Sequence, residues 1–159
     1  SEFFEHTDEK SSNIFEHAID WLNGNCFFNT NKQLSGDTLF QIQSDAIRKL
    51  ASEKSCVIVG RCSDYILRDN PNCVSIFLHS SDEIRAERIS QRLNVSFDDA
   101  LTIMRKEDKK RADYYNFYSD KTWGDSATYD LSIDVSKIGE EKTVEFILSY
   151  LTMRFSNHF

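Results

Sequence analysis

A chain of 159 residues with 40% hydrophobic and 13% aromatic residues has the composition of one globular domain of ordinary size. Its formal net charge of -7 argues against a protein whose main partner is a nucleic acid, and no apolar run in the sequence approaches membrane-spanning length. The four cysteines show no Cys-x-x-Cys spacing, which favours reduced thiols and a cytoplasmic protein.

The first half of the chain predicts two helices followed by two strands. Apolar residues predict a short helix over 15–22, and a clean amphipathic pattern predicts a second helix over 39–50. The run Cys56–Val59 is too short for a helix and ends at Gly60, so it predicts a buried strand that delivers Arg61 at its carboxyl end. A second mostly apolar run predicts a strand over 73–80.

The second half predicts two helices, a strand and a last helix. Ser80 with Glu83 forms a capping-box pattern that predicts a helix running to about Leu93. Ser96 with Asp99 is a weaker cap for a helix that reaches the tyrosines near 115. Alternation over 129–136 predicts a strand, and the apolar positions between 144 and 155 predict the final helix.

This alternation of helices and strands predicts an α/β fold. Apolar strands buried by helices on both faces indicate a parallel sheet in a three-layer arrangement. Ligands of such sheets bind at the carboxyl ends of the strands, which is where Arg61 is expected.

Arginines repeat along the helix predicted after residue 80. Arg85, Arg88 and Arg92 fall on one helical face because steps of three and four residues return to nearly the same side. A solvated face with Glu87 and Asp82 as ion-pair partners explains the same pattern.

A denser cluster of five cations occupies residues 105–111. Within it, Arg105, Asp108 and Arg111 are spaced by three and could converge on one small ligand. An arginine fork matches phosphate geometry, and a carboxylate between two arginines could accept from an exocyclic amine. A charged helix face with internal ion pairs remains the alternative. The aromatic residues that follow are expected to pack rather than to stack on single-stranded nucleic acid: Tyr114, Tyr115, Phe117 and Tyr118.

Other kinds of chemistry find little support in the sequence. The four histidines show no metal-ligand spacing, and no Ser-His-Asp order suggests a nucleophile. We interpret Cys62 as a small polar filler, although its place after the predicted strand would also suit a reactive thiol.

Three blocks of the sequence, taken in order, resemble the cytidylate kinase-like family of nucleoside monophosphate kinases: VIVGRCSDYIL, VSIFLHSSDEIRAERI and RKEDKKRADYYNFYSDKTWGDSATYDLSID. The resemblance covers roughly residues 37–151. It implies a P-loop kinase-like fold in one domain over 1–159, with a helical and loop region near the acceptor over 1–36. The core would then comprise 37–95 and 119–159, and the lid-like helix 96–118.

The resemblance also implies roles for particular side chains. Arg61 would hold the phosphate of the acceptor monophosphate, while Asp108 and Arg111 would meet the cytosine edge and phosphate, with Arg105 nearby. Arg88, and Arg85 beside it, would face the phosphates of the donor nucleotide. Cytidylate kinases have Gly-Arg-Asp where this chain has Gly60-Arg61-Cys62, so Cys62 replaces an acceptor-side carboxylate.

The sequence contains no G-x-x-x-x-G-K-[ST] loop, and its five glycines are too scattered to cradle a phosphate. In the family this loop follows a first, central strand. Loss of a central strand would leave buried backbone groups unpaired, so we expect that strand and loop in a segment upstream of Ser1.

The leading hypothesis is therefore ATP-dependent phosphoryl transfer, with Mg²⁺, to CMP, dCMP or a similar small acceptor. A nucleotide-binding or regulatory module without turnover is the second, and a nucleic-acid binder is a weaker third. The expected partners are small-molecule nucleotides, with neither a nucleic acid nor a membrane, and a homodimer is left open.

Overall fold

The computed structural model describes residues 36–156. The chain divides into two compact units, residues 1–57 and residues 58–159, and the domain boundaries inferred from the sequence stay a prediction. The first unit contributes helix α2 (Gly36–Glu53), which confirms the helix predicted over 39–50 and extends it at both ends. The helix predicted over 15–22 lies outside the described residues.

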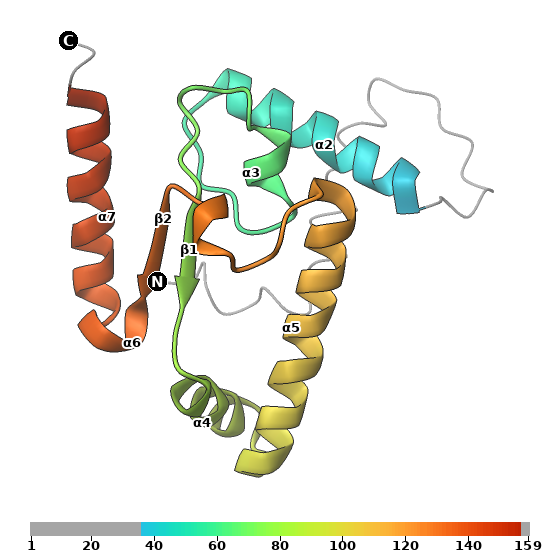
Figure 1. Cartoon of the computed structure of the whole chain (residues 1–159), viewed down its shortest axis with the longest axis vertical. Helices are drawn as coiled ribbons and strands as arrows, with labels where there is room; N and C mark the ends of the chain where they lie inside the picture. Colours follow the sequence, from blue (N-terminus) through green and yellow to red (C-terminus); the bar gives the residue numbers. More distant parts are fainter. Residues whose placement is uncertain (1–35, 157–159) are drawn as a thin grey trace. The chain divides into compact units, whose positions relative to one another are not determined.

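Two parallel strands form the sheet that the structure describes (Figure 1). Strand β1 (Ile76–His79) pairs with β2 (Leu131–Asp134), so that Ile76 lies opposite Leu131 and His79 opposite Asp134. Parallel neighbours need a long crossover, and here it contains helices α4 and α5. Both strands are shorter than the predicted ranges 73–80 and 129–136, but their type and parallel direction are as expected.

The prediction of a strand over Cys56–Val59 is wrong for this structure. The segment has no regular secondary structure, and Val57 and Val59 are 94% and 85% exposed. A strand persists only where a neighbour takes up its backbone hydrogen bonds, and in the described part of the chain β1 and β2 pair only with each other. The α/β character is therefore present, while the full three-layer sheet stays a prediction.

Helices α4 (Asp82–Leu93) and α5 (Phe97–Ser119) form the crossover. Ser81, not Ser80, caps α4 by accepting a hydrogen bond from the Ile84 amide, so the predicted capping box is one residue out of register. Ser96 caps α5 as predicted, accepting from the Asp99 amide at 3.1 Å. The helix continues to Ser119, beyond the expected end near 115.

Small residues are buried where α4 and α5 pack against each other. Ala86 and Ala100 are fully buried, and Met104 is 2% exposed. Alanine lets two helix backbones approach closely, while the flexible Met104 side chain can fill the remaining space. This packing fixes the polar faces of the two helices next to each other.

Three short helices and one long one complete the second unit: α3 (Ser63–Ile66), the 3₁₀ turn η1 (Ser126–Thr128), α6 (Val135–Ile138) and α7 (Glu140–Phe155). Asp130 connects the starts of both strands to α7, because it accepts from the Ser75 amide at 2.8 Å and from Arg154 at 2.8 Å. These bonds lower the pKa of Asp130 although its partial burial opposes the shift.

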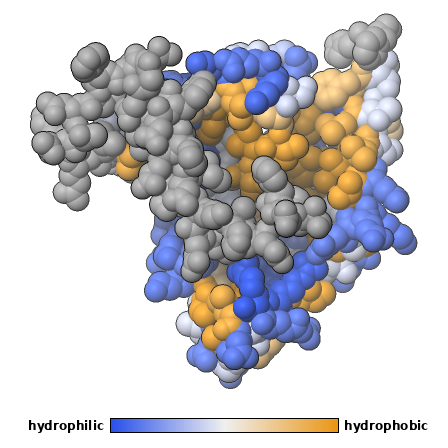
Figure 2. All heavy atoms as spheres, turned by 180° about the vertical axis from the view of Figure 1, so that it is seen from behind, coloured by the Kyte–Doolittle hydropathy of each residue, from blue (hydrophilic) through white to orange (hydrophobic). Residues whose placement is uncertain are grey.

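Helix α7 exposes several large apolar side chains. Val144, Phe146, Leu148 and Met153 are between 48% and 63% exposed. Figure 2 shows a broad hydrophobic area on this face, toward the carboxyl-terminal end of the chain. No helix among residues 36–156 is both long and apolar enough to cross a bilayer.

Candidate functional site

The arginines of α4 share one face, as their spacing predicts. Arg85, Arg88 and Arg92 line a shallow, open depression of about 350 Å³ together with Ile89. Arg88 also forms an ion pair of 2.9 Å with Glu140 at the start of α7, but both side chains are well exposed. An exposed pair of this kind exchanges easily with solvent or with a bound anion.

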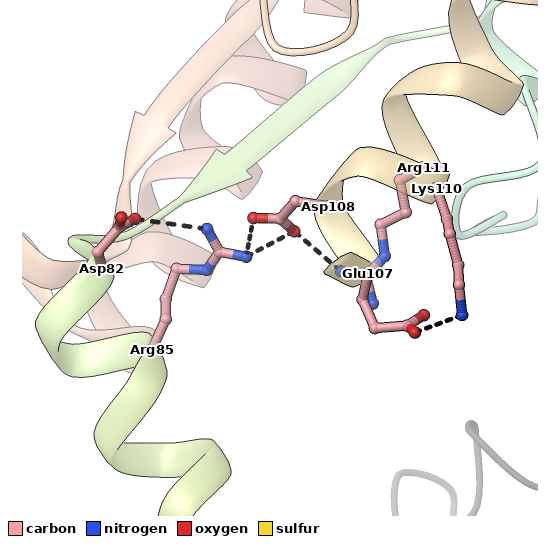
Figure 3. A network of polar contacts seen from close by, with 6 residues as sticks. All are labelled: Asp82, Arg85, Glu107, Asp108, Lys110 and Arg111. Atoms are coloured by element: carbon pink, nitrogen blue, oxygen red, sulfur yellow. Dashed lines mark hydrogen bonds and ion pairs between the residues drawn. The ribbon is translucent and has the colours of Figure 1, made fainter. Parts of the chain in front are cut away.

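Asp108 of α5 lies at the centre of a polar cluster that joins α5 to α4 (Figure 3). The Arg85 Nη2 atom donates to both carboxylate oxygens, at 2.7 Å to Oδ1 and 2.6 Å to Oδ2. The Arg111 Nη1 atom donates to Oδ1 at 3.1 Å. The Asp108 side chain is only 20% exposed, so these contacts are partly shielded from water.

Arg105 does not take part in this cluster. It is exposed and forms no ion pair with another residue of the described range, so the carboxylate sits between Arg85 and Arg111 instead of between Arg105 and Arg111. Sequence spacing predicted the Arg111 contact because it lies within one helix. It could not predict Arg85, which is 23 residues away on another helix. The roles that the family resemblance implies for Arg105 and Arg85 stay predictions.

The outer side of α5 behaves as an ordinary charged face. Lys110 donates to Glu107 at 2.6 Å, and this hydrogen bond is the main cause of the lowered pKa of the Glu107 carboxyl. Both side chains are substantially exposed. The solvated-face interpretation therefore holds for this pair, although it does not hold for Asp108.

Arg61 lies in a left-handed turn that precedes α3. Gly60, Arg61 and Cys62 have φ values of +69°, +57° and +55°, and only the first of them is a glycine. Each non-glycine residue in this region costs on the order of 1 kcal/mol, so the surrounding contacts must hold the turn in place. The arginine that was expected at the end of a strand is thus presented by a tight turn.

A hydrogen bond between Tyr115 and Asp64 joins α3 to α5. The buried Tyr115 hydroxyl donates to Asp64 Oδ2 at 2.5 Å, and burial together with this bond raises the pKa of Tyr115. Tyr115 follows Asp108 by seven residues, or about 10 Å along the helix. The turn that carries Arg61 is therefore held near the carboxyl-terminal end of α5, whereas the Asp108 cluster lies at the middle of the helix.

Cys62 is a buried filler. It is 3% exposed, and burial, with a smaller contribution from the charge of Asp64, raises the pKa of its thiol to about 11. A thiol with such a pKa is almost entirely protonated at neutral pH. Of the two interpretations of Cys62 from the sequence, the filler is the one that fits its surroundings.

Aromatic side chains pack between β1 and the segment that follows α5. Phe77 stacks on Tyr129 with ring centroids 5.0 Å apart and meets Trp123 edge to face at 5.4 Å. The packing role predicted for the aromatic residues over 114–118 is confirmed for Tyr115, which is 5% exposed, but it is wrong for Phe117, which is 71% exposed. Asp64, the polar partner of Tyr115, was not predicted. No sequence signal marked Asp64, because its partner is 51 residues away.

The sequence matches the cytidylate kinase-like family over residues 1–137. The chain belongs to this family. This match confirms the resemblance carried by the three motif blocks, and Arg61, Asp108 and Arg111 lie within the matched region.

Several archaeal cytidylate kinases are similar in sequence. The enzyme of Methanothrix thermoacetophila is 31% identical over 114 residues, which cover 72% of this chain and 64% of that protein. A relative from Saccharolobus islandicus is 28% identical, covering 68% and 57%, and one from Pyrobaculum islandicum is 32% identical, covering 69% and 59%. The chain thus spans about 57–64% of the length of these relatives.

A solved structure has a similar fold. The crystal structure of an uncharacterized protein from Eubacterium ventriosum superposes with a TM-score of 0.70 at 39% sequence identity. The match covers 72% of this chain and 73% of that one. It supports a mixed α/β, kinase-like fold.

Proposed function

We propose that the protein transfers the γ-phosphoryl group of ATP to a nucleoside monophosphate, with CMP or dCMP as the acceptor. The proposal rests on family membership together with one structural observation, the Arg85–Asp108–Arg111 cluster. In this cluster, a carboxylate that can accept a hydrogen bond from an amino group lies beside cations that can contact phosphates.

Phosphoryl transfer suits a site made of arginines. The transferred group carries charge on its oxygens in the transition state, so the protein contributes positioning and positive charge rather than a nucleophile. In this proposal Arg61 binds the acceptor phosphate, and Asp108 and Arg111 bind the acceptor base and phosphate. Arg88 and Arg105 supply further positive charge toward the reacting phosphates.

Mg²⁺ would enter such a reaction with ATP. Magnesium is commonly held by substrate phosphates and only one or two carboxylates. Residues 36–156 contain no group of three or more His, Cys, Asp or Glu side chains arranged to hold a metal.

The alternative is a nucleotide-binding or regulatory module without turnover. Two features of the sequence favour it: the 159 residues contain no glycine-rich loop of the kind that cradles the phosphates of ATP, and Cys62 stands where cytidylate kinases have an aspartate.

The test is an acceptor panel assayed with the full-length protein. Nucleotide binding is measured by calorimetry with CMP, dCMP, UMP and AMP, and ATP consumption is measured with each acceptor in the presence of Mg²⁺. We expect ADP and CDP to form most efficiently from CMP. Binding of CMP without ADP release would favour the regulatory module, and absence of both binding and turnover would contradict the proposal.

A further inference from the structure

Arg85 makes the closest contact to the Asp108 carboxylate. A single nitrogen, Nη2, bridges both oxygens at 2.7 and 2.6 Å, and the Arg85 side chain is 29% exposed. From the other side, the Arg85 Nη1 atom lies 3.9 Å from an Asp82 carboxylate oxygen (Figure 3). The guanidinium is therefore held between two carboxylates and is not directed only toward the open depression on α4.

The contacts of Asp108 leave a defined part of its carboxylate available. Two carboxylate oxygens offer about four lone-pair sites in total. Oδ1 uses two of them, for Arg85 and Arg111, while Oδ2 uses one, for Arg85. One site on Oδ2 remains for a further donor, and the Asp108 side chain as a whole is 20% exposed.

We propose that Arg85 is a positioning residue for the acceptor base, which fixes the Asp108 carboxylate so that Oδ2 presents one acceptor site to an exocyclic amino group. This inference rests on the proposed function and deepens it, because it moves Arg85 from the donor phosphates to the acceptor side. A base with an amino group at that position donates to the free site of Oδ2. A base with a carbonyl there places two acceptors against each other and is rejected.

A purely structural role for Arg85 makes a different prediction. If the ion pair only tied α4 to α5, its removal would lower thermal stability and leave the choice of acceptor unchanged. If Arg85 bound the donor, its removal would raise the KM for ATP. A positioning role instead changes the preference between CMP and UMP while the KM for ATP is kept.

The experiment compares Arg85→Ala with Lys110→Ala in the full-length protein. Lys110 is a cation on α5 two residues from Asp108, but it pairs with Glu107 and does not contact Asp108. We expect Arg85→Ala to lower the ratio of kcat/KM for CMP over UMP by roughly tenfold, the scale of coupling between residues in contact. Lys110→Ala should leave that ratio within about twofold.

Two further variants make the test specific to the Arg85–Asp108 contact. Arg85→Lys retains the positive charge and the aliphatic stem, so it should recover part of the preference, and it remains usable if Arg85→Ala fails to fold. In the double variant, Arg85→Ala should cost no further preference once Asp108→Asn is present, because both changes remove the same oriented carboxylate.

Three results would overturn the inference. An unchanged CMP to UMP ratio in both Arg85 variants would leave only a structural role, and a raised KM for ATP with an unchanged ratio would return Arg85 to the donor. If the losses of CMP preference caused by Arg85→Ala and Asp108→Asn added up in the double variant, the two residues would act independently. In each case wild-type turnover of CMP would still support the proposed function, whereas a wild-type protein that phosphorylates no acceptor would remove both.

Discussion

The two halves of the segment 105–129 differ in how they contact the rest of their unit. The first half, in the middle of α5, carries Asp108 and Arg111 in a charged cluster with α4, whereas the second half begins near the end of α5 with the buried Tyr115, bonded to Asp64. Beyond the helix, Trp123 and Tyr129 pack on Phe77. A charged, partly exposed cluster can exchange partners with a ligand, but a packed aromatic cluster cannot do so without losing buried area.

From this difference we expect substitutions in the two halves to have separate effects. Substitutions in the aromatic half should change the stability of the fold. Substitutions in the charged half should change the choice of substrate far more than they change stability.

The largest effect is expected at Gly124, in the aromatic half. Its φ is +80°, and an added Cβ would lie 3.3 Å from the Phe77 ring. Gly124→Ala should therefore lower the free energy of unfolding by about 2–4 kcal/mol, from backbone strain and from overpacking. Denaturant unfolding of the second unit would measure this loss.

A matched control separates the two causes. Gly139 has a φ of +82°, but nothing lies within 4 Å of its added Cβ. Its ψ of 166° places Gly139 in a region that is essentially restricted to glycine, so Gly139→Ala should show only the backbone cost, about 1–3 kcal/mol. A loss in Gly124→Ala of no more than about 1 kcal/mol would mean that the Phe77 contact contributes nothing and that the aromatic half is looser than its packing indicates.

The second prediction concerns the charged half. Asp108→Asn keeps the size of the side chain but supplies an amide that can turn either its oxygen or its nitrogen toward the base. The preference for CMP over UMP should fall by one or two powers of ten, about the energy of one discriminating charged hydrogen bond. Steady-state kinetics with both acceptors would measure the ratio.

Arg111→Ala serves as the comparison for Asp108→Asn. A phosphate contact carries no information about the base, so this variant should lower turnover of both acceptors to a similar extent. Identical profiles for the two variants would mean that the charged half does not distinguish the bases.

Sequence patterns predicted the elements of both halves because those patterns are local. Periodicity and caps located α4 and α5 to within a few residues, and apolar alternation located β2. The segment 56–59 could not be predicted in the same way, because a strand depends on a neighbour that its own residues do not specify. Ser80 and Ser81 could both cap the helix through their hydroxyl groups, and the structure shows that Ser81 does so.

For a related reason, sequence patterns could not predict contacts between residues that lie far apart along the chain. Arg85 has the same spacing pattern as Arg88 and Arg92, so nothing in the sequence distinguished the arginine that binds Asp108. Asp64 and Tyr115 likewise carry no periodic signal for each other. The family resemblance supplied the positions of the candidate site, but it did not supply their partners.

The third prediction returns to the aromatic half. Tyr115→Phe removes the hydroxyl that donates to Asp64 and leaves a partly buried carboxylate without that partner. The free energy of unfolding should fall by about 1–2 kcal/mol. Tyr65→Phe, in the same short helix as Asp64, should change stability by less than about 0.5 kcal/mol. Equal losses at the two positions would show that the Tyr115 bond does not anchor α3.

The fourth prediction uses the raised pKa of Cys62. Burial moves this pKa from 9.0 to about 11, so between these values the folded thiol keeps a proton that the unfolded thiol releases. The contribution of Cys62 to stability is therefore complete below pH 9, and it is lost as the pH rises toward 11. By pH 10 the loss should be about 1 kcal/mol.

Unfolding experiments at pH 8 and pH 10 would measure this loss. In Cys62→Ala the corresponding fall should be smaller by about that amount, because alanine has no proton to release. Alkylation gives an independent comparison, since the exposed Cys56 should react with iodoacetamide well before Cys62 does. Equal rates at the two cysteines would mean that the turn before α3 opens readily.

The smallest effect is expected at Lys110, on the outer side of the charged half. The Lys110–Glu107 ion pair has the same 2.6 Å separation as the Arg85–Asp108 pair, but its side chains are 61% and 44% exposed, against 29% and 20%. Water screens the exposed pair, so Lys110→Ala should shift the midpoint of thermal unfolding by no more than about one degree. The pKa of Glu107 should nevertheless rise in this variant, because its main depressing contact is removed. Carboxyl titration by NMR would detect that rise. A large loss of stability in Lys110→Ala would mean that distance rather than burial sets the strength of these pairs, and the division of residues 105–129 into an adaptable and a packed half would fail.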